Sequence, residues 1–225
     1  MADTPRGRVR FLETIGGARR LQVRLPLGII QMEARGRPDG ARPLGYESEL
    51  GRACAAAERP GADGCRLLAE ESALYRQRAG ALLTLGEHAL AALDATHCVE
   101  IAHLVRVREP AEFASQAFGR LLLAGILLRT RALASGALTA NNANAALRAV
   151  ESGLAEIEAC ESAGEPLDHE RVGEVEALRS LREALVPKLP ASQRVEISER
   201  IAAALRAENY ELAAILRNEL RQLGS

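Results

Sequence analysis

At 225 residues the chain is long enough for one domain of about 150 residues plus an appendage, and it needs no disulfide or metal to fold. Its 29 basic and 30 acidic residues give a formal net charge of -1, which argues against a strong non-specific nucleic-acid binder. Aromatic residues make up only 3% and tryptophan is absent, so the core must consist of Leu, Ala, Val and Ile, which favours helices.

Targeting and metal-binding patterns are not found in the sequence. The first residues contain no apolar segment of the secretory type, and the longest apolar run, residues 121–128, is eight residues, whereas a membrane-spanning helix needs roughly 20. We therefore expect a cytoplasmic protein. The cysteines, Cys54, Cys65, Cys98 and Cys160, lack the Cys-x-x-Cys spacing of zinc sites, and we expect them to be reduced and buried.

Residues 1–45 form the only part of the chain with strand character. Apolar residues alternate with polar ones over residues 21–27, which predicts a strand, and residues 9–12 can pair with it across Gly16-Gly17. Apolar residues continue to Met32, and a Pro/Gly/Arg loop starts at Gly36. We predict a small β-hairpin here, and whether it docks on the rest of the chain stays open.

From residue 46 the apolar pattern is helical. We predict a helical bundle over residues 46–188, with helices at 46–58, 64–85, 87–107, 110–135, 141–162 and 168–187. The predicted breaks contain Gly or Pro: Pro60-Gly61, Gly86, Pro110, Gly136 and Gly164 with Pro166. The fourth helix is apolar almost all round over residues 121–128, so it should lie at the centre of the bundle.

Two helix pairs resemble tetratricopeptide repeats in the placing of small residues. Ala91 and Cys98 in one pair correspond to Ala146 and Gly153 in the other, an offset of 55 positions in the sequence. A tandem array would recur at about 34 residues. The resemblance therefore implies two repeat-like hairpins with an extra helix between them.

Pro187 to Ser192 marks the predicted boundary of a last segment, residues 192–225. This segment has two apolar helical stripes, with Asn209 at the reversal between them. The first stripe contains Ile197, Ile201 and Leu205, and the second contains Leu212, Leu216 and Leu220. A two-helix hairpin of this size cannot bury both stripes by itself, so it should dock on the body of the chain or on a partner.

Over about 27 residues this segment resembles the UVR motif of bacterial excinuclease subunits B and C and of stress-regulatory proteins tied to Clp ATPases. Tyr210 stands at the motif's aromatic position, Ala213-Ala214 at its paired alanines and Leu216-Arg217 at its Leu-Arg, while Asn218 replaces the usual Asp. The resemblance implies a protein-interaction element that pairs with another copy of itself. The candidate partner-binding residues are Ile197, Ile201, Leu205, Tyr210, Ala213, Leu216, Arg217 and Leu220.

The loop from Gly36 to Glu47 is the densest polar cluster. Its arginines could hold an anion or a peptide carboxylate, which makes it a candidate ligand site comprising Arg37, Asp39, Arg42, Tyr46 and Glu47. The favoured alternative is a rigid connection in which Arg37 and Asp39 pair locally and the other charges face water.

Catalytic and metal motifs are not present in the sequence. His97 and His103 are six residues apart, so they do not share a helical face as metal-binding pairs do. No nucleophile, Walker or Rossmann pattern occurs. We expect no catalytic centre, no metal and no cofactor.

The favoured hypothesis is a mainly α, non-enzymatic adaptor whose C-terminal hairpin binds another protein with a UVR-type hairpin or a second copy of the chain, with no nucleic acid and no membrane as partner. One alternative is an accessory factor of nucleotide excision repair that binds an excinuclease subunit. A second alternative is an enzyme or ligand-binding protein with its site in the loop of Arg37 to Glu47.

Overall fold

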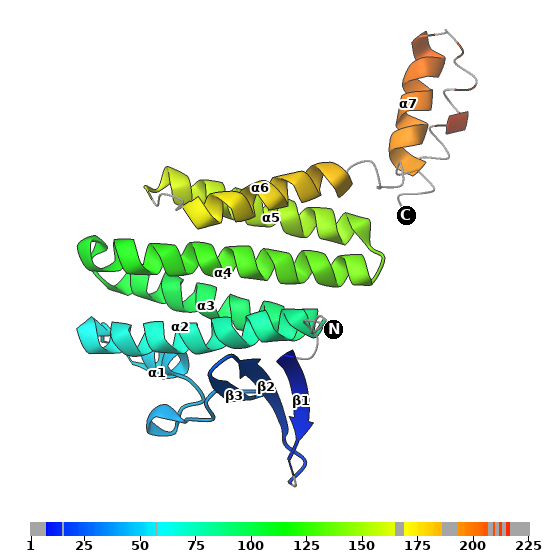
Figure 1. The fold of residues 1–225 in the computed structure, drawn as a ribbon. Coiled ribbons are helices and arrows are strands. Elements are labelled where there is room, and N and C mark those ends of the chain that lie inside the picture. Colours follow the sequence, from blue (N-terminus) through cyan, green and yellow to red (C-terminus); the bar gives the residue numbers. More distant parts are fainter. Residues whose placement is uncertain are drawn as a thin grey trace. The chain divides into compact units, whose positions relative to one another are not determined.

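A computed structural model describes residues 8–14, 16–56, 58–164, 169–185, 193–206, 209, 212 and 215–216. The chain forms two compact units, Met1–Arg182 and Glu183–Ser225. The protein is mainly α-helical with a small antiparallel sheet near its N-terminus, as predicted (Figure 1). The predicted linker at residues 187–192 lies outside the described residues, so the division into domains stays a prediction.

The sheet contains three strands in the order β1-β2-β3: β1 Val9–Glu13, β2 Arg19–Leu25 and β3 Gly28–Glu33. The first two pair as the predicted hairpin, with Val9 opposite Val23, and Gly17 takes a positive φ of 77° in the turn. The third strand continues the alternation, placing Met32 opposite Leu21. These strands dock on the helices, because Val9, Leu21 and Met32 share a buried cluster with residues of α2, α3 and α4.

In the described residues up to Leu185, six α-helices follow the sheet, and most of their positions agree with the predicted ones. Their bounds are α1 Glu49–Ala55, α2 Gly61–Thr84, α3 His88–Arg108, α4 Ala111–Thr139, α5 Ala143–Ser162 and α6 His169–Leu185. Helix α1 is shorter than expected, because Pro43–Gly45 forms a 3-10 turn and Ser48 then caps α1 through its hydroxyl, which accepts from the Gly51 backbone N–H at 2.9 Å.

The predicted helix break at Gly136 is wrong. Helix α4 continues through Gly136 to Thr139, and the turn falls at Asn141, whose φ is 55°, before Asn142 caps α5. Gly136 has another use, because a Cβ there would lie 3.1 Å from the Cβ of His88 on α3. The glycine permits close approach of two helices and does not end one.

Helix α4 is the centre of the larger core, as predicted. Leu122, Leu123, Ile126 and Leu127 are each 1% exposed and pack with residues of α3, α5 and α6. Residues 118–139 are long and apolar enough to cross a membrane by length and composition alone. Because Arg129 and Arg131 within this segment form ion pairs with α5 and α6, the packing is that of a core helix and is compatible with a soluble protein.

Small residues mark the closest helix crossings. A Cβ on Gly125 would lie 2.9 Å from Val99 Cγ2 on α3, and a Cβ on Gly153 would lie 2.0 Å from Thr130 Oγ1 on α4. Ala91, Cys98 and Ala146 are fully buried. The tetratricopeptide likeness stays a prediction, since close crossings of this kind occur in many helical folds.

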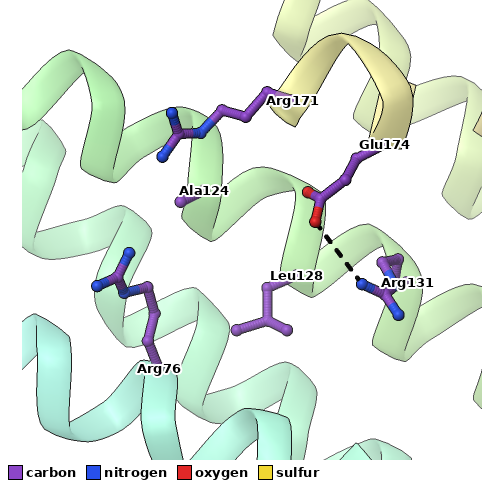
Figure 2. A pocket seen from close by; sticks show the side chains of 6 residues that line it. All are labelled: Arg76, Ala124, Leu128, Arg131, Arg171 and Glu174. Carbon is purple, nitrogen blue, oxygen red and sulfur yellow. Dashed lines mark ion pairs between the residues drawn. The ribbon is translucent and has the colours of Figure 1, made fainter. Parts of the chain in front are cut away.

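Three helices that are far apart in the sequence, α2, α4 and α6, leave a pocket of about 240 Å³ between them (Figure 2). The lining residues are Arg76, Ala124, Leu128, Arg131, Arg171 and Glu174.

The second unit contains α7, Gln193–Arg206, followed by helical conformation at Leu212, Ile215 and Leu216. Asn209 lies between these parts: its backbone N–H donates to the Ala204 carbonyl at 2.9 Å, and its side chain accepts from the Leu212 N–H at 3.1 Å. Asn209 thus ends one helical segment and caps the next, which is its expected place at the reversal.

Candidate functional site

The candidate loop is fastened to the helical body through Arg37. Its guanidinium Nε lies 3.0 Å from Asp39 Oδ1, and its Nη1 lies 3.2 Å from Glu71 Oε2 on α2. Its side chain is only 12% exposed. Asp39 also accepts from the Ala41 N–H at 3.0 Å, which stabilises the turn. The structure therefore brings Arg37 and Asp39 together as the local pair that the alternative interpretation requires.

The other three candidates in the loop face solvent. Arg42 and Glu47 are exposed, and Tyr46 is 43% exposed. Between them, Leu44 has a positive φ of 49° and is 87% exposed. These side chains are accessible to a ligand, whereas Arg37 already pairs with Asp39 and Glu71 and lies 4.0 Å from a carboxylate oxygen of Glu49.

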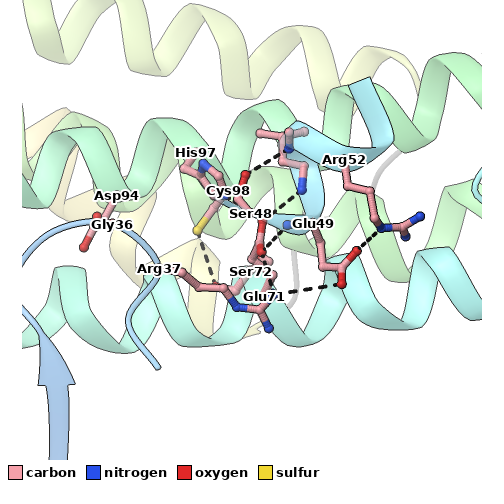
Figure 3. A network of polar contacts seen from close by, with 12 residues as sticks. Gly36, Arg37, Ser48, Glu49, Arg52, Glu71, Ser72, Asp94, His97 and Cys98 are labelled. Atoms are coloured by element: carbon pink, nitrogen blue, oxygen red, sulfur yellow. Dashed lines mark hydrogen bonds and ion pairs between the residues drawn. The ribbon is translucent and has the colours of Figure 1, made fainter. Parts of the chain in front are cut away.

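Glu71 is the centre of a buried polar network that the sequence analysis missed (Figure 3). Its carboxylate is fully buried and accepts from the backbone N–H groups of Glu49 at 2.7 Å and Leu50 at 3.1 Å, at the start of α1. His97 Nε2 on α3 lies 2.9 Å from the same carboxylate. One side chain of α2 thus holds α1, α3 and the loop.

The ionised form of Glu71 is favoured despite its burial. Burial raises the pKa of this carboxyl, but the hydrogen bonds from His97 and from the backbone of Glu49 and Leu50 lower it more, so the pKa lies below its ordinary value. The negative charge also faces the N-terminal end of α1, where helix N–H groups favour it. Glu71 is therefore a charged anchor at neutral pH.

A second buried pair, Arg78 and Asp94, lies beside the first. Arg78 donates to both carboxylate oxygens of Asp94 at 2.8 and 2.7 Å and, through Nη1, to the carbonyls of Glu33 and Gly36 at 2.9 and 2.8 Å. Burial raises the pKa of Asp94, while Arg78 lowers it, and burial is the larger effect. This pair locks the end of β3 and the loop onto α2 and α3.

A cavity of about 480 Å³ lies against Arg78, Asp94 and His97, and its other lining residues include Gly36, Tyr75 and Leu82. The Tyr75 and His97 rings stack at 3.9 Å, and burial raises the pKa of Tyr75 to about 12. The neighbouring Cys98 donates to the Ser72 carbonyl at 3.4 Å, and burial raises the pKa of its thiol to about 11. A thiol of that pKa stays protonated at neutral pH and is a poor nucleophile.

The buried charged residues of α2 could have been recognised in the sequence from their helical spacing. Leu68, Glu71, Tyr75, Arg78 and Leu82 recur at intervals of three and four along α2, so the charged residues share a face with buried apolar ones. A charge on such a face is buried with a partner. Its partner cannot be named from that pattern.

Among the residues that the structure describes, no group of three or more His, Cys, Asp or Glu side chains is placed to hold a metal ion. Cys65, Cys98 and Cys160 are buried as expected, whereas Cys54, at the end of α1, is exposed.

The C-terminal unit presents apolar side chains to solvent. Leu205 is 40% exposed, Leu212 39% and Ile215 58%. In contrast, Ala204 and Leu216 are buried, and Ile201 is half-buried. Of the other candidate partner-binding residues, the side chain of Ile197 and the whole of Tyr210, Ala213, Arg217 and Leu220 lie outside the described residues.

These features define a class of protein: a mainly α-helical protein with a small N-terminal sheet and a separate helical unit at its C-terminal end. Comparison with family models, with curated proteins and with solved structures finds no match to this chain. The resemblances to the UVR motif and to tetratricopeptide repeats therefore remain proposals.

Proposed function

We propose that this chain is a non-enzymatic, cytoplasmic protein-interaction protein that associates through its C-terminal helical unit. The observation that supports the proposal best is the set of exposed apolar side chains on that unit, Leu205, Leu212 and Ile215. Exposed Leu and Ile side chains that gather on one small unit are typical of contact surfaces. The proposed occupant is a second copy of this unit or a UVR-type hairpin of another protein.

The free energy expected from covering these three apolar side chains is moderate. Complete burial of a Leu or Ile side chain stabilises by about 1.5–3 kcal/mol. Since the three side chains are already about half buried, covering them gives roughly 2–4 kcal/mol per copy. In a symmetric dimer both copies contribute, for a total of about 4–8 kcal/mol, which only reaches the lower part of the roughly 4–15 kcal/mol lost on association. Other residues of the unit must therefore contribute to the contact as well.

The loop of Arg37 to Glu47 supports an enzymatic function less well. The donors of Arg37 are directed to Asp39 and Glu71, and Glu71 in turn holds α1. Replacing Arg37 should therefore destabilise the protein. A loss of binding in that variant would not by itself show that the loop holds a ligand.

The test compares full-length protein with the double variant Leu212→Glu and Ile215→Glu. The matched control is Val107→Glu on α3, which introduces the same residue at an apolar position that is 84% exposed. Sedimentation velocity should show a concentration-dependent dimer for the wild type and the control, and a monomer for the double variant. Circular dichroism verifies that all three retain their helical content.

Affinity capture from the cytoplasm with the same three proteins tests for a heterologous partner. A UVR-type protein retained by the wild type and control but lost from the double variant would supply the partner, and an excinuclease subunit would assign it to repair. A monomeric wild type whose captured proteins match those of the double variant would overturn the proposal.

A further inference from the structure

The cavity of about 480 Å³ beside Arg78, Asp94 and His97 has walls from three parts of the first unit. Residues 34–36, which follow β3, form one wall, and α2 and α3 form the others. Figure 3 shows three of the lining residues, Gly36, Asp94 and His97, near the Glu71 network. The volume falls within the roughly 300–1,000 Å³ typical of sites for small molecules.

Most charged groups at this cavity are already neutralised by partners. Arg78 donates to both carboxylate oxygens of Asp94, so this pair carries no net charge. His97 Nε2 lies 2.9 Å from the carboxylate of Glu71, which also pairs with Arg37. These groups hold the cavity in shape, and their charges are not available to a ligand.

Arg35 differs from these groups. Its side chain lines the cavity and is exposed, and no hydrogen bond or ion pair joins its guanidinium to another residue that the structure describes. A guanidinium in this setting can take an anion without first giving up a partner. Among the described lining residues, Arg35 thus supplies an uncompensated positive charge.

The remaining wall of the cavity is largely apolar. Leu82 is fully buried and Leu90 is half-buried, whereas Leu93 is 66% exposed. An apolar group that enters the cavity would remove part of this leucine surface from water, which favours binding. Apolar surface next to one positive charge favours a ligand whose apolar body ends in one anionic group.

We propose that this cavity binds a small monocarboxylic acid with an apolar body, whose carboxylate pairs with Arg35 and whose apolar part covers Leu90 and Leu93. A guanidinium offers two parallel N–H donors that match the oxygens of a carboxylate. A dianion such as a phosphomonoester is a poorer ligand, because its second charge finds no free cation here and is repelled by Asp94. This binding site goes beyond the proposed association and does not depend on it.

The experiment is isothermal titration calorimetry of the full-length chain with octanoate as the probe. Acetate and octanol are the matched probes, because acetate has the carboxylate without the chain and octanol has the chain without the carboxylate. Since both parts of octanoate contribute, its dissociation constant should be at least about tenfold lower than that of either matched probe.

Two variants at exposed positions separate the two contributions. Arg35→Gln should raise the dissociation constant of octanoate about tenfold and leave that of octanol unchanged, because it removes only the ion pair. Leu93→Ser should raise both constants several-fold, because it removes apolar surface. Circular dichroism verifies that both variants retain the helical content of the wild type.

The matched controls make the same changes away from the cavity. Arg66→Gln removes a charge from an exposed position of α2, and Leu133→Ser removes a leucine that is 47% exposed on α4. Both should leave the binding of octanoate unchanged. Absence of octanoate binding at millimolar concentration, equally tight binding of octanol or acetate, or an unchanged dissociation constant of octanoate in Arg35→Gln or Leu93→Ser would overturn the proposal.

Discussion

Glu71 connects three parts of the N-terminal unit through one carboxylate. It accepts from the backbone at the start of α1, contacts His97 on α3 and pairs with Arg37 in the loop. A buried charge is tolerated only where such partners replace the lost water. Because the loop that carries Arg37 follows β3, the pair of Glu71 and Arg37 also helps to hold the sheet.

Glu71→Gln is expected to lower the free energy of unfolding at pH 7 by roughly 2 kcal/mol, since an amide cannot accept from all of these donors. The pKa of Glu71 is lowered in the folded state, so its stabilisation is present above about pH 4, the pKa of an unperturbed Glu, and is lost as the pH falls through the folded-state pKa. Urea unfolding between pH 7 and pH 3 measures both effects.

The variant should therefore lose less stability on acidification than the wild type does. Glu70→Gln is the matched control, because Glu70 neighbours Glu71 on α2 but is 56% exposed and pairs with Arg66 at the surface. An equal acid dependence of the wild type and Glu71→Gln would contradict the assigned role.

At the scale of elements, glycines decide how closely α4 and its neighbours approach. Gly153 on α5 faces Thr130 on α4, where a Cβ would lie 2.0 Å from the hydroxyl oxygen and 2.6 Å from the methyl carbon. Such a contact cannot be relieved by a flexible side-chain end, since Thr130 is itself buried and branched at Cβ. The crossing of α4 and α5 thus depends on the absence of a side chain.

Gly153→Ala should destabilise the protein by about 1–3 kcal/mol through overpacking, although alanine favours helices more than glycine does. Gly80→Ala is the matched control on α2, because a Cβ there meets nothing within 4 Å. This control should stabilise by about 0.5–1 kcal/mol. Thermal unfolding of the two variants checks the opposite signs, and a stabilised Gly153→Ala would show that α4 and α5 do not cross as described.

At the scale of the whole molecule, the Glu71 network and the proposed contact surface belong to different compact units. Glu71 lies within Met1–Arg182, and the exposed Leu205, Leu212 and Ile215 lie within Glu183–Ser225. Substitutions at sites without shared partners usually have additive effects. We therefore expect association through the second unit to be energetically independent of the Glu71 network.

The expected outcome is that Glu71→Gln, at pH 7, leaves the sedimentation behaviour of the wild type unchanged, because it alters contacts of the first unit only. Sedimentation velocity on the folded variant checks this. A weaker dimer of Glu71→Gln would show instead that the units are coupled.

The sequence alone determined what depends on neighbours along the chain. The hairpin of β1 and β2, most helix positions, the central place of α4 and the reversal at Asn209 follow from apolar periodicity and from Gly, Pro and Asn at breaks. Gly136 shows the limit of such signals, because a glycine that ends a helix and one that admits a neighbouring helix have the same sequence pattern.

Only the tertiary structure decided which distant side chains meet. Arg78 pairs with Asp94, and Glu71 pairs with Arg37, because α2, α3 and the loop pack against one another. The pocket between α2, α4 and α6 is lined by residues of three helices that no local sequence pattern relates. A buried charge is tolerated only where partners from distant parts of the chain lie beside it. Helix propensity and apolar periodicity, in contrast, depend on residues within a few turns of the chain. For that reason the sequence placed the elements, and the packing between them made the candidate sites.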